Sequence, residues 1–361
     1  MTLRSKELGL FKSHLPSGKF NSITDIKDFL VGYKTICQKP NASNSSLIRS
    51  GVTVLLPRGR EKNPSPVWAG FYSLNGNGEM TGTHWIKDGG YFVGPICLTN
   101  SHNIGIVHHT ATKWMIKNYK KQWTEKHLWA MPVVAETYDG VLSNINSQPI
   151  TENDVWQAFS NAKTGKVKEG NVGGGTGMIC YEFKGGTGTS SKIVKINKTK
   201  YTLATIVQAN HGIRPWFTVE GKNLGKQITR NRLLNTKELD SKEKGSIVVI
   251  IATDAPMLPH QLKRLAKRAA IGIGRTGTPG GNNSGDIFLA LSTNNKKKLP
   301  QIDRAMNKFE YLNDEVFDTF YEAVVQSTEE SILNAMLAAK DMVSIKPKGK
   351  LISSLKPQDL K

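Results

Sequence analysis

The chain has 361 residues, of which 38% are hydrophobic, so it can bury a sizeable core as one large α/β unit. Its formal charge of +20 is unevenly spread: residues 1–283 carry 38 basic and 18 acidic residues, whereas residues 284–361 carry 11 of each. The basic residues are scattered, and no zinc-finger, helix-turn-helix or RNP-type motif accompanies them. These features argue against a specific nucleic-acid partner and favour a solvated, lysine-rich surface with a weak attraction to polyanions.

The sequence also argues against a membrane protein and against metal or cofactor chemistry. No stretch approaches the roughly 18–20 consecutive apolar residues of a membrane span, and residues 1–20 lack a secretory core, so we expect a soluble, cytoplasmic protein. Cys37, Cys97 and Cys180 form no CxxC pair, which predicts buried free thiols. There is no HExxH or Walker-type motif, and the GxGxxG match at 272–277 follows a helical pattern instead of a strand. We therefore expect no metal and no cofactor.

Glycine-rich polar clusters divide the chain, and the apolar runs between them predict the elements. In chain order, the pattern predicts a strand over 51–56, a helix capped by Thr151, strands over 202–207 and 247–252, a basic helix over 259–270, and a strand over 287–290. Two last helices are predicted over 313–325 and 327–340. The residues beyond, 345–361, are rich in Lys, Pro and Ser, which predicts a loosely held end. Residues 1–344 are expected to form a single domain.

The segment with a chemical signal runs from Gly280 to Asp286, reads GGNNSGD, and leads directly into the last predicted strand. Its glycines tolerate unusual backbone angles, so the Ser284 hydroxyl can approach the carbonyl of Asn283. Scission there would give Ser284 a free α-amine with a pKa of about 7.7–8, which can take the proton of its own hydroxyl. On the local pattern alone, an ordinary glycine turn before a strand remains the simpler interpretation.

Several long blocks elsewhere in the chain carry a family resemblance. They are residues 21–25 (NSITD), 70–82 (GFYSLNGNGEMTG), 133–140 (VVAETYDG), 169–181 (EGNVGGGTGMICY), 207–212 (VQANHG), 252–268 (ATDAPMLPHQLKRLAKR) and 283–289 (NSGDIFL). In this order they resemble the L-aminopeptidase/D-amino-acid esterases and β-aminopeptidases, the self-processing hydrolases called the DmpA or P1 peptidase family. The likeness extends from about residue 8 to residue 339.

The resemblance implies a four-layer αββα sandwich of the N-terminal-nucleophile type, similar to that of the ornithine acetyltransferases. It implies cleavage between Asn283 and Ser284 into an α chain, 1–283, and a β chain, 284–361. The implied activity is that of a serine aminopeptidase that hydrolyses short peptides, amino-acid amides or esters, including D- or β-amino-acid substrates. The resemblance also implies a tetramer of αβ units.

The matching motifs imply roles for individual residues. Ser284 is the expected nucleophile and new N-terminus. The side-chain amide of Asn210 is expected to stabilise the oxyanion, a contribution that typically changes rates about 100- to 1,000-fold. Tyr138 is expected to support the oxyanion or a proton transfer. Glu136 is expected to hold the amino group of the substrate. From the residues alone, Asn210 could instead support a turn at a strand end, and Tyr138 could pack in the core. Glu136 could be a salt-bridged surface residue.

Ser327 and Glu329 match a family Ser-x-Glu pair near the nucleophile. Residues 327–330 read STEE, so Ser327 is also predicted to cap a helix together with Glu330, which leaves Glu329 free to orient the α-amine of Ser284. Asp286 and Gly285 are expected to support the nucleophile loop.

Two other classes of function remain open from the sequence. The ornithine acetyltransferases also cleave their own chain, although their pattern has a threonine as the nucleophile. Acyl transfer is therefore one alternative. The +20 charge keeps a polyanion-binding protein without enzyme activity as the other. Trp85, His211 and Trp216 are candidates to line a substrate pocket.

Overall fold

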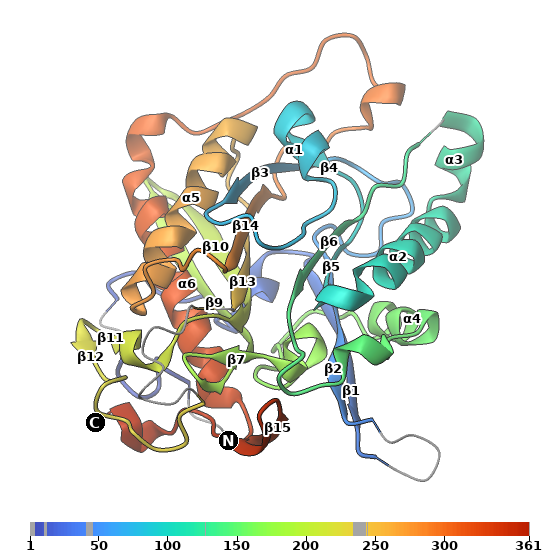
Figure 1. Ribbon diagram of the computed structural model, residues 1–361. Coiled ribbons are helices and arrows are strands. Elements are labelled where there is room, and N and C mark those ends of the chain that lie inside the picture. The colour runs from blue at the N-terminus through green and yellow to red at the C-terminus, as the bar shows by residue number, and fades with distance from the viewer. Residues whose placement is uncertain are drawn as a thin grey trace.

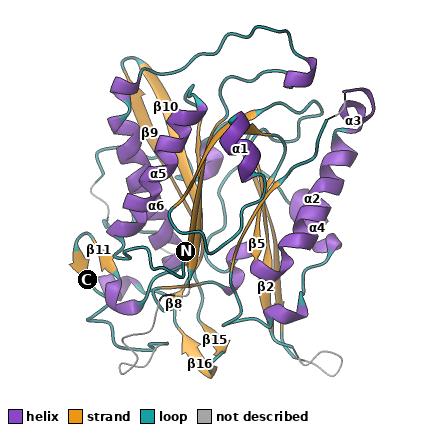
Figure 2. Ribbon diagram, turned by 45° about the horizontal axis from the view of Figure 1, so that its top comes forward, coloured by secondary structure: helices purple, strands orange, loops and turns teal. Residues whose placement is uncertain are grey.

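Two β-sheets lie face to face, and helices cover the outer face of each sheet (Figure 1, Figure 2). The computed structural model describes residues 4–10, 13–40, 46–126, 128–233, 243 and 245–360. The layers follow the order helix, sheet, sheet, helix, which confirms the predicted αββα sandwich.

The first sheet has four strands and is mixed, with two antiparallel pairings and one parallel pairing. Its strands, in spatial order, are β1 (Leu30–Gln38), β2 (Ile48–Leu56), β5 (Ile96–Asn100) and β6 (Val133–Thr137). β1, β2 and β5 pair antiparallel, whereas β5 and β6 are parallel. The outer helices on this side are α2 (Ile104–Asn118), α3 (Lys120–Lys126) and α4 (Glu152–Ser160).

The second sheet has six strands and places the predicted nucleophile segment at its centre. In spatial order the strands are β4 (Tyr91–Phe92), β3 (Val67–Ser73), β14 (Gly285–Ser292), β13 (Ser246–Thr253), β10 (Thr199–Asn210) and β9 (Gly186–Ile196). β14 is parallel to β13 and antiparallel to β3. The long helices α5 (Pro259–Arg275) and α6 (Asp318–Ala338) cover this sheet, and α1 (Thr83–Gly89) precedes β4.

Three buried clusters fill the spaces between the four layers. Because side chains alternate along a strand, Phe288 of β14 packs with Leu265 of α5, whereas its neighbour Ile287 packs between the sheets. In β6, Val133 likewise faces the other sheet, and Val134 faces the helices. The strands are buried on both sides, which explains their continuous apolar runs.

Three short hairpins complete the fold outside the two sheets. They are β7 (Ile179–Cys180) with β8 (Phe183–Lys184), β11 (Thr218–Val219) with β12 (Lys222–Asn223), and β15 (Met342–Ile345) with β16 (Lys348–Ile352). Within the described parts of the chain, no helix combines the length and the apolar character that crossing a membrane requires.

Most predicted elements are confirmed, with wider bounds. The four predicted strands are β2, β10, β13 and β14, and the basic helix is α5, which continues to Arg275. Thr151 caps α4 as predicted, because its side chain accepts a hydrogen bond from the Asp154 backbone and the Asp154 carboxylate accepts one from the Thr151 backbone.

The predicted break between two C-terminal helices is wrong. α6 runs without interruption from Asp318 to Ala338, so Ser327 lies in its middle and caps nothing. The Ser327 hydroxyl donates to the carbonyl of Val324 at 3.3 Å, which is how a buried serine is satisfied inside a helix. Residues 327–337 are buried, and this packing outweighs the local capping signal.

The predicted loose end is wrong as well. Ile352 and Leu355 are buried, and the Lys184 backbone donates to the carbonyl of Ser353 at 2.8 Å. Asp359 forms an ion pair with Arg230. Buried side chains, a backbone hydrogen bond and an ion pair together hold this segment against the body.

The cysteine prediction holds for two residues of three. Cys97 and Cys180 are buried free thiols, whereas Cys37 is exposed. Cys37 lies on β1, an edge strand, where side chains near the strand end reach solvent.

Candidate active site

Ser284 lies immediately before β14 and is fully buried. Its hydroxyl donates to Oδ1 of Asp286 at 2.6 Å, and its backbone N–H donates to the carbonyl of Gly281 at 2.9 Å. The next N–H, that of Gly285, donates to the Ser246 hydroxyl at 3.1 Å. The predicted nucleophile is thus held at the entrance to a central strand, with a carboxylate on its hydroxyl.

The turn before Ser284 is fixed by the buried carboxylate of Glu243. This carboxylate accepts hydrogen bonds from the Gly281 backbone at 2.9 Å and the Thr278 hydroxyl at 3.3 Å, and it also accepts one from the Gly212 backbone. The left-handed backbone angles in this turn fall on glycine, with φ of 75° at Gly280. The flexibility that the glycines were expected to supply is therefore used upstream of the serine.

A loop from a distant part of the chain, residues 73–79, lies over the predicted cleavage site. The side-chain amide of Asn77 donates to the carbonyl of Asn283 at 2.6 Å. The side-chain amide of Asn75 donates to the Gly281 carbonyl at 3.1 Å and to Oδ2 of Asp286 at 3.2 Å. Asn77 therefore bonds to the carbonyl of the Asn283–Ser284 peptide bond itself, and Asn75 bonds to groups before and after it.

Glu136 lies on the other side of the same loop. Its Oε1 accepts a hydrogen bond from the Glu79 backbone at 2.9 Å, and its Oε2 accepts one from the Ser101 hydroxyl. A Cβ added to Gly78 would lie 3.3 Å from Glu136 Oε1 and 3.5 Å from the Gly285 Cα, so a single residue separates this carboxylate from the start of β14. None of the described Lys, Arg or His side chains forms an ion pair with Glu136.

Asn210 lies near the same end of the sheet but has other partners. Cross-strand pairing aligns Asn210 with Ser246 and Ser246 with Gly285, so the three residues form a row across β10, β13 and β14. The Asn210 side chain accepts from the Ile179 backbone at 2.8 Å and donates to the Tyr138 carbonyl at 3.1 Å. With the peptide bond before Ser284 intact, this amide is occupied.

Tyr138 follows β6 and is 38% exposed, so it does not pack in the core as the alternative interpretation requires. Its ring makes an edge contact with His102. A Cβ on Gly140 would lie 2.2 Å from the Tyr138 hydroxyl, which shows that the side chain folds back over that glycine.

Ser327 and Glu329 bond to groups other than Ser284. Oε2 of Glu329 accepts a hydrogen bond from the Arg275 guanidinium at 2.6 Å. Burial raises the pKa of Glu329, and the charge of Arg275 partly offsets this rise. Because Arg275 ends α5 and the chain continues from there to the cleavage segment, the pair anchors the upstream end of that segment.

Three residues at this site were missed by sequence reasoning. Asn75 and Asn77 lie in one of the glycine-rich polar clusters, and no role was predicted for either of them, although asparagine side chains that bond the backbone are typical of turns. Glu243 gave no signal, because its contacts bring together segments that are far apart in the sequence.

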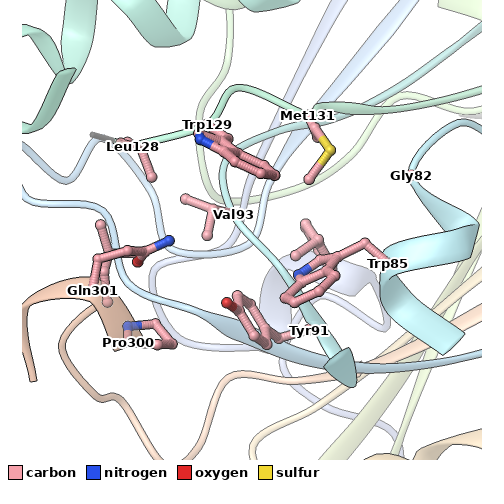
Figure 3. A pocket seen from close by; sticks show the side chains of 11 residues that line it. Gly82, Trp85, Tyr91, Val93, Leu128, Trp129, Met131, Pro300 and Gln301 are labelled. Carbon is pink, nitrogen blue, oxygen red and sulfur yellow. The ribbon is translucent and has the colours of Figure 1, made fainter. Parts of the chain in front are cut away.

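A separate apolar pocket of about 540 Å³ lies at the other end of β6 from Glu136. Figure 3 shows the side chains around it, among them Trp85, Tyr91, Trp129 and Met131. Trp85 lines this pocket, but none of the predicted catalytic residues does, so the expected contact of Trp85 with substrate stays a prediction. Of the other two candidates, His211 is buried and packs against Tyr181. Among the described residues, no group of His, Cys, Asp and Glu side chains could hold a metal ion.

Comparison with known proteins places the whole chain in one family. The model of peptidase family S58 matches residues 21–349. The chain belongs to peptidase family S58. A beta-peptidyl aminopeptidase, BapA, from Sphingosinicella microcystinivorans is 41% identical over 353 residues, covering 95% of this chain and 87% of that protein.

Two solved structures of similar proteins show the same fold over nearly the full length of this chain. The L-aminopeptidase D-Ala-esterase/amidase of Ochrobactrum anthropi, described as a variant of the Ntn-hydrolase fold, is 48% identical, with a TM-score of 0.93 and coverage of 99% of this chain and 96% of that one. A Burkholderia sp. beta-aminopeptidase is 37% identical, with a TM-score of 0.87 and coverage of 99% and 97%. The chain is accordingly a hydrolase of the aminopeptidase class with an Ntn-type αββα fold.

Proposed function

We propose that this aminopeptidase cleaves its own Asn283–Ser284 bond and then uses Ser284 as its nucleophile. The observation that supports this most is the position of Ser284 at the start of a central strand, with its hydroxyl bonded to Asp286 and the carbonyl before it bonded to Asn77. The substrates are short peptides, amino-acid amides or esters with a free amino group. The relatives named for L-amino-acid and β-peptide substrates make both classes the first to test.

In the cut enzyme, the α-amine of Ser284 takes the hydroxyl proton while the oxygen attacks the substrate carbonyl. Glu136, a buried carboxylate without a described cationic partner, binds the amino group of the substrate. Asn210 and Tyr138 support the oxyanion, which requires the Asn210 amide to leave the Tyr138 carbonyl. Water then hydrolyses the acyl-enzyme ester.

Glu329 and Ser327 act as positioning residues in this scheme. Glu329 fixes Arg275 at the end of α5, and Ser327 lies two residues before Glu329 in the buried part of α6. A tetramer of αβ units in the cytoplasm completes the proposal, and native mass spectrometry tests its assembly.

Intact mass spectrometry of the wild type beside Ser284→Ala tests the cleavage. We expect two wild-type fragments that meet between Asn283 and Ser284, a whole Ser284→Ala chain, and wild-type cleavage in the control Ser147→Ala, which changes an exposed serine. Turnover of amino-acid and β-amino-acid amides by the cut protein then defines the substrate class. A Ser284→Ala chain that is cut, or an uncut wild type that is active, would contradict the proposal.

A further inference from the structure

A buried carboxylate that the proposed mechanism does not use lies three residues after Glu136. The Oδ2 atom of Asp139 accepts the Ser50 hydroxyl at 2.6 Å and the side-chain amide of Asn100 at 3.1 Å, and this amide also donates to the Ser50 hydroxyl at 2.8 Å. The three side chains form a closed polar cluster between β2, β5 and the segment after β6, and each is at most 1% exposed. Such a cluster fixes its members, because a buried polar group without a partner is costly.

Asn100 links this cluster to the turn that begins α2. Its side-chain Oδ1 accepts the backbone N–H of Asn103 at 2.9 Å and so caps the short helix Ser101–Asn103, which leads directly into α2. The pairing of β5 with β6 ends at Asn100 and Thr137, so the sheet does not place the residues beyond it. The position of the turn therefore follows from the side chain of Asn100.

The same turn contacts two residues of the proposed active site. Ser101 donates its hydroxyl to Oε2 of Glu136, and the ring of His102 makes an edge contact with the ring of Tyr138. Because Ser101 follows Asn100 directly, a shift of the Asn100 side chain moves the donor that orients the Glu136 carboxylate. Hydrogen bonds and a short stretch of backbone thus join the buried cluster to this carboxylate.

We propose that Asp139 is a positioning residue for substrate binding, which acts through Asn100 and the 101–103 turn to hold the Glu136 carboxylate where it meets the amino group of the substrate. This inference rests on the proposed function, because it presumes that Glu136 binds that amino group. The sequence block that contains Glu136 and Tyr138 also contains Asp139, for which no role was predicted.

The charges around Asp139 allow it to act as a charged acceptor. Burial raises the pKa of Asp139 to about 7, while the hydrogen bonds of the cluster and of its own backbone and the positive charge of Lys184 oppose the rise. Lys184 is buried as well, and its ammonium group donates to the carbonyl oxygens of Met178 and Gly185 at 2.8 Å and 2.9 Å, so the backbone fixes this charge. At about pH 8 the carboxylate is therefore mostly ionised, and a charged acceptor forms the stronger hydrogen bonds.

A role in folding alone would also account for a buried polar cluster, but it predicts a different response to a second substitution. A residue that only stabilises the fold changes substrate binding independently of Glu136. A residue that acts through Glu136 has no further effect on binding once that carboxylate is gone. The interaction between the two substitutions therefore decides between the two roles.

The test combines Asp139→Ala with Glu136→Gln and measures hydrolysis of an amino-acid 4-nitroanilide by the cut enzyme. Asp139→Ala removes the acceptor of both hydrogen bonds and should raise KM about 10-fold while kcat stays within about threefold, because the Glu136 carboxylate is displaced and the nucleophile is not. In the Glu136→Gln background the same substitution should change KM by less than about twofold. Asn100→Ala breaks the link at its other end and should behave like Asp139→Ala in both backgrounds.

Two aspartate variants serve as controls. Asp139→Asn keeps one side-chain oxygen for both donors of the cluster, so its KM should stay within about threefold of the wild type. Asp254→Asn changes a partly buried aspartate that accepts the Thr202 backbone N–H at 2.8 Å, at the opposite end of β10 from Asn210, and its KM should not change. Intact mass spectrometry and urea unfolding report whether each variant is cut and how much stability it has lost.

The outcomes are distinguishable. A wild-type KM in Glu136→Gln overturns the amino-group site of the proposed function itself. If Glu136→Gln raises KM, but Asp139→Ala raises it equally in both backgrounds or leaves it unchanged, the role of Asp139 is wrong. Should Asp139→Ala fail to fold or to be cut, Asn100→Ala carries the same comparison, and a KM that is unchanged or rises equally in both backgrounds overturns the proposal.

Discussion

Gly285 shows how a single missing side chain lets two distant segments meet. A Cβ at this position would lie 2.3 Å from the Asn77 carbonyl, a distance that real Cβ atoms do not show, and the neighbour is backbone that cannot rotate away. Gly285→Ala should therefore displace the 73–79 loop, slow self-cleavage, and lower the free energy of unfolding by about 1–3 kcal/mol.

Urea unfolding in the uncut Ser284→Ala background measures the stability part of this prediction, and gels of the otherwise wild-type chain measure cleavage. Gly274→Ala is the matched control, since nothing lies within 4 Å of its added Cβ and α5 gains helix propensity there. Equal behaviour of Gly285→Ala and Gly274→Ala would show that the close approach does not matter.

Glu136 offers a prediction about substrate binding. Glu136→Gln removes the negative charge that we propose pairs with the amino group of the substrate, while the side chain keeps an oxygen for the Glu79 backbone. A hydrogen bond to a charged group contributes about 1.5–3 kcal/mol, so KM should rise roughly 10- to 100-fold while self-cleavage stays normal.

Steady-state assays with amino-acid 4-nitroanilides check this, with Glu125→Gln, an exposed glutamate on α3, as control. An unchanged KM in Glu136→Gln would remove the amino-group role. A loss of self-cleavage would show instead that Glu136 supports the loop at Asn77.

At the residue scale, sequence and family resemblance predicted a site at Ser284 but not all of the groups that bond to its loop. Ser284, Asp286 and Gly285 form one short motif, so their proximity could be predicted from the sequence. Asn77 bonds to a residue 206 positions away, and such a contact depends on the pairing of β3 with β14. No local pattern specifies that register.

At the scale of elements, α6 shows a local signal that the tertiary structure overrides. The STEE sequence has the form of a capping box, but Glu330 is buried and bonds to Lys192, Ser190 and Asn21 instead of the helix backbone. The strands were easier to predict, because they are buried on both faces and therefore appear as unbroken apolar runs.

The buried Lys192–Glu330 pair gives a prediction for the contact between β9 and α6. Burial alone would raise the pKa of Glu330, but the Lys192 charge and the hydrogen bonds outweigh it, so the pKa lies below its usual value. Lys192→Met leaves a buried carboxylate unpaired and should destabilise the fold by about 3–5 kcal/mol at pH 7.

The pH dependence has a defined sign. A lowered acid pKa contributes stability above the unfolded pKa of about 4.3, and this contribution is lost as the pH falls through the folded pKa. The deficit of Lys192→Met should therefore shrink at acidic pH, where the unpaired, buried Glu330 of the variant takes up a proton. Urea unfolding of the uncut Ser284→Ala chain at about pH 7 and pH 4 tests this, with exposed Lys195→Met as control. An equal deficit at both pH values would contradict it.

At the scale of the whole molecule, the β chain is built into the structure rather than added to its edge. β14 lies between β13 and β3, pairing with β13 over eight residues, and α6 packs on β9 and β10. The fully buried side chains Phe288, Leu289 and Leu291 lie on both faces of this strand. Cleavage before Ser284 therefore cuts one peptide bond without removing any of these contacts.

Cleavage should change the reaction order of unfolding while leaving the folded particle intact. Native mass spectrometry should show the α and β chains of the wild type as one complex, because separating them would open the second sheet and expose its core.

The unfolded state of the cut enzyme is two chains, so its unfolding midpoint in urea should rise with protein concentration. When the folded particles have the same assembly state, the urea midpoint of the uncut Ser284→Ala chain should depend less on protein concentration than that of the cut enzyme. Midpoints measured over about a 100-fold range of protein concentration test this. Such a range changes the apparent free energy of unfolding into two chains by about 2.7 kcal/mol. Separate α and β chains in native buffer would mean that β14 is not held as its strand pairing requires.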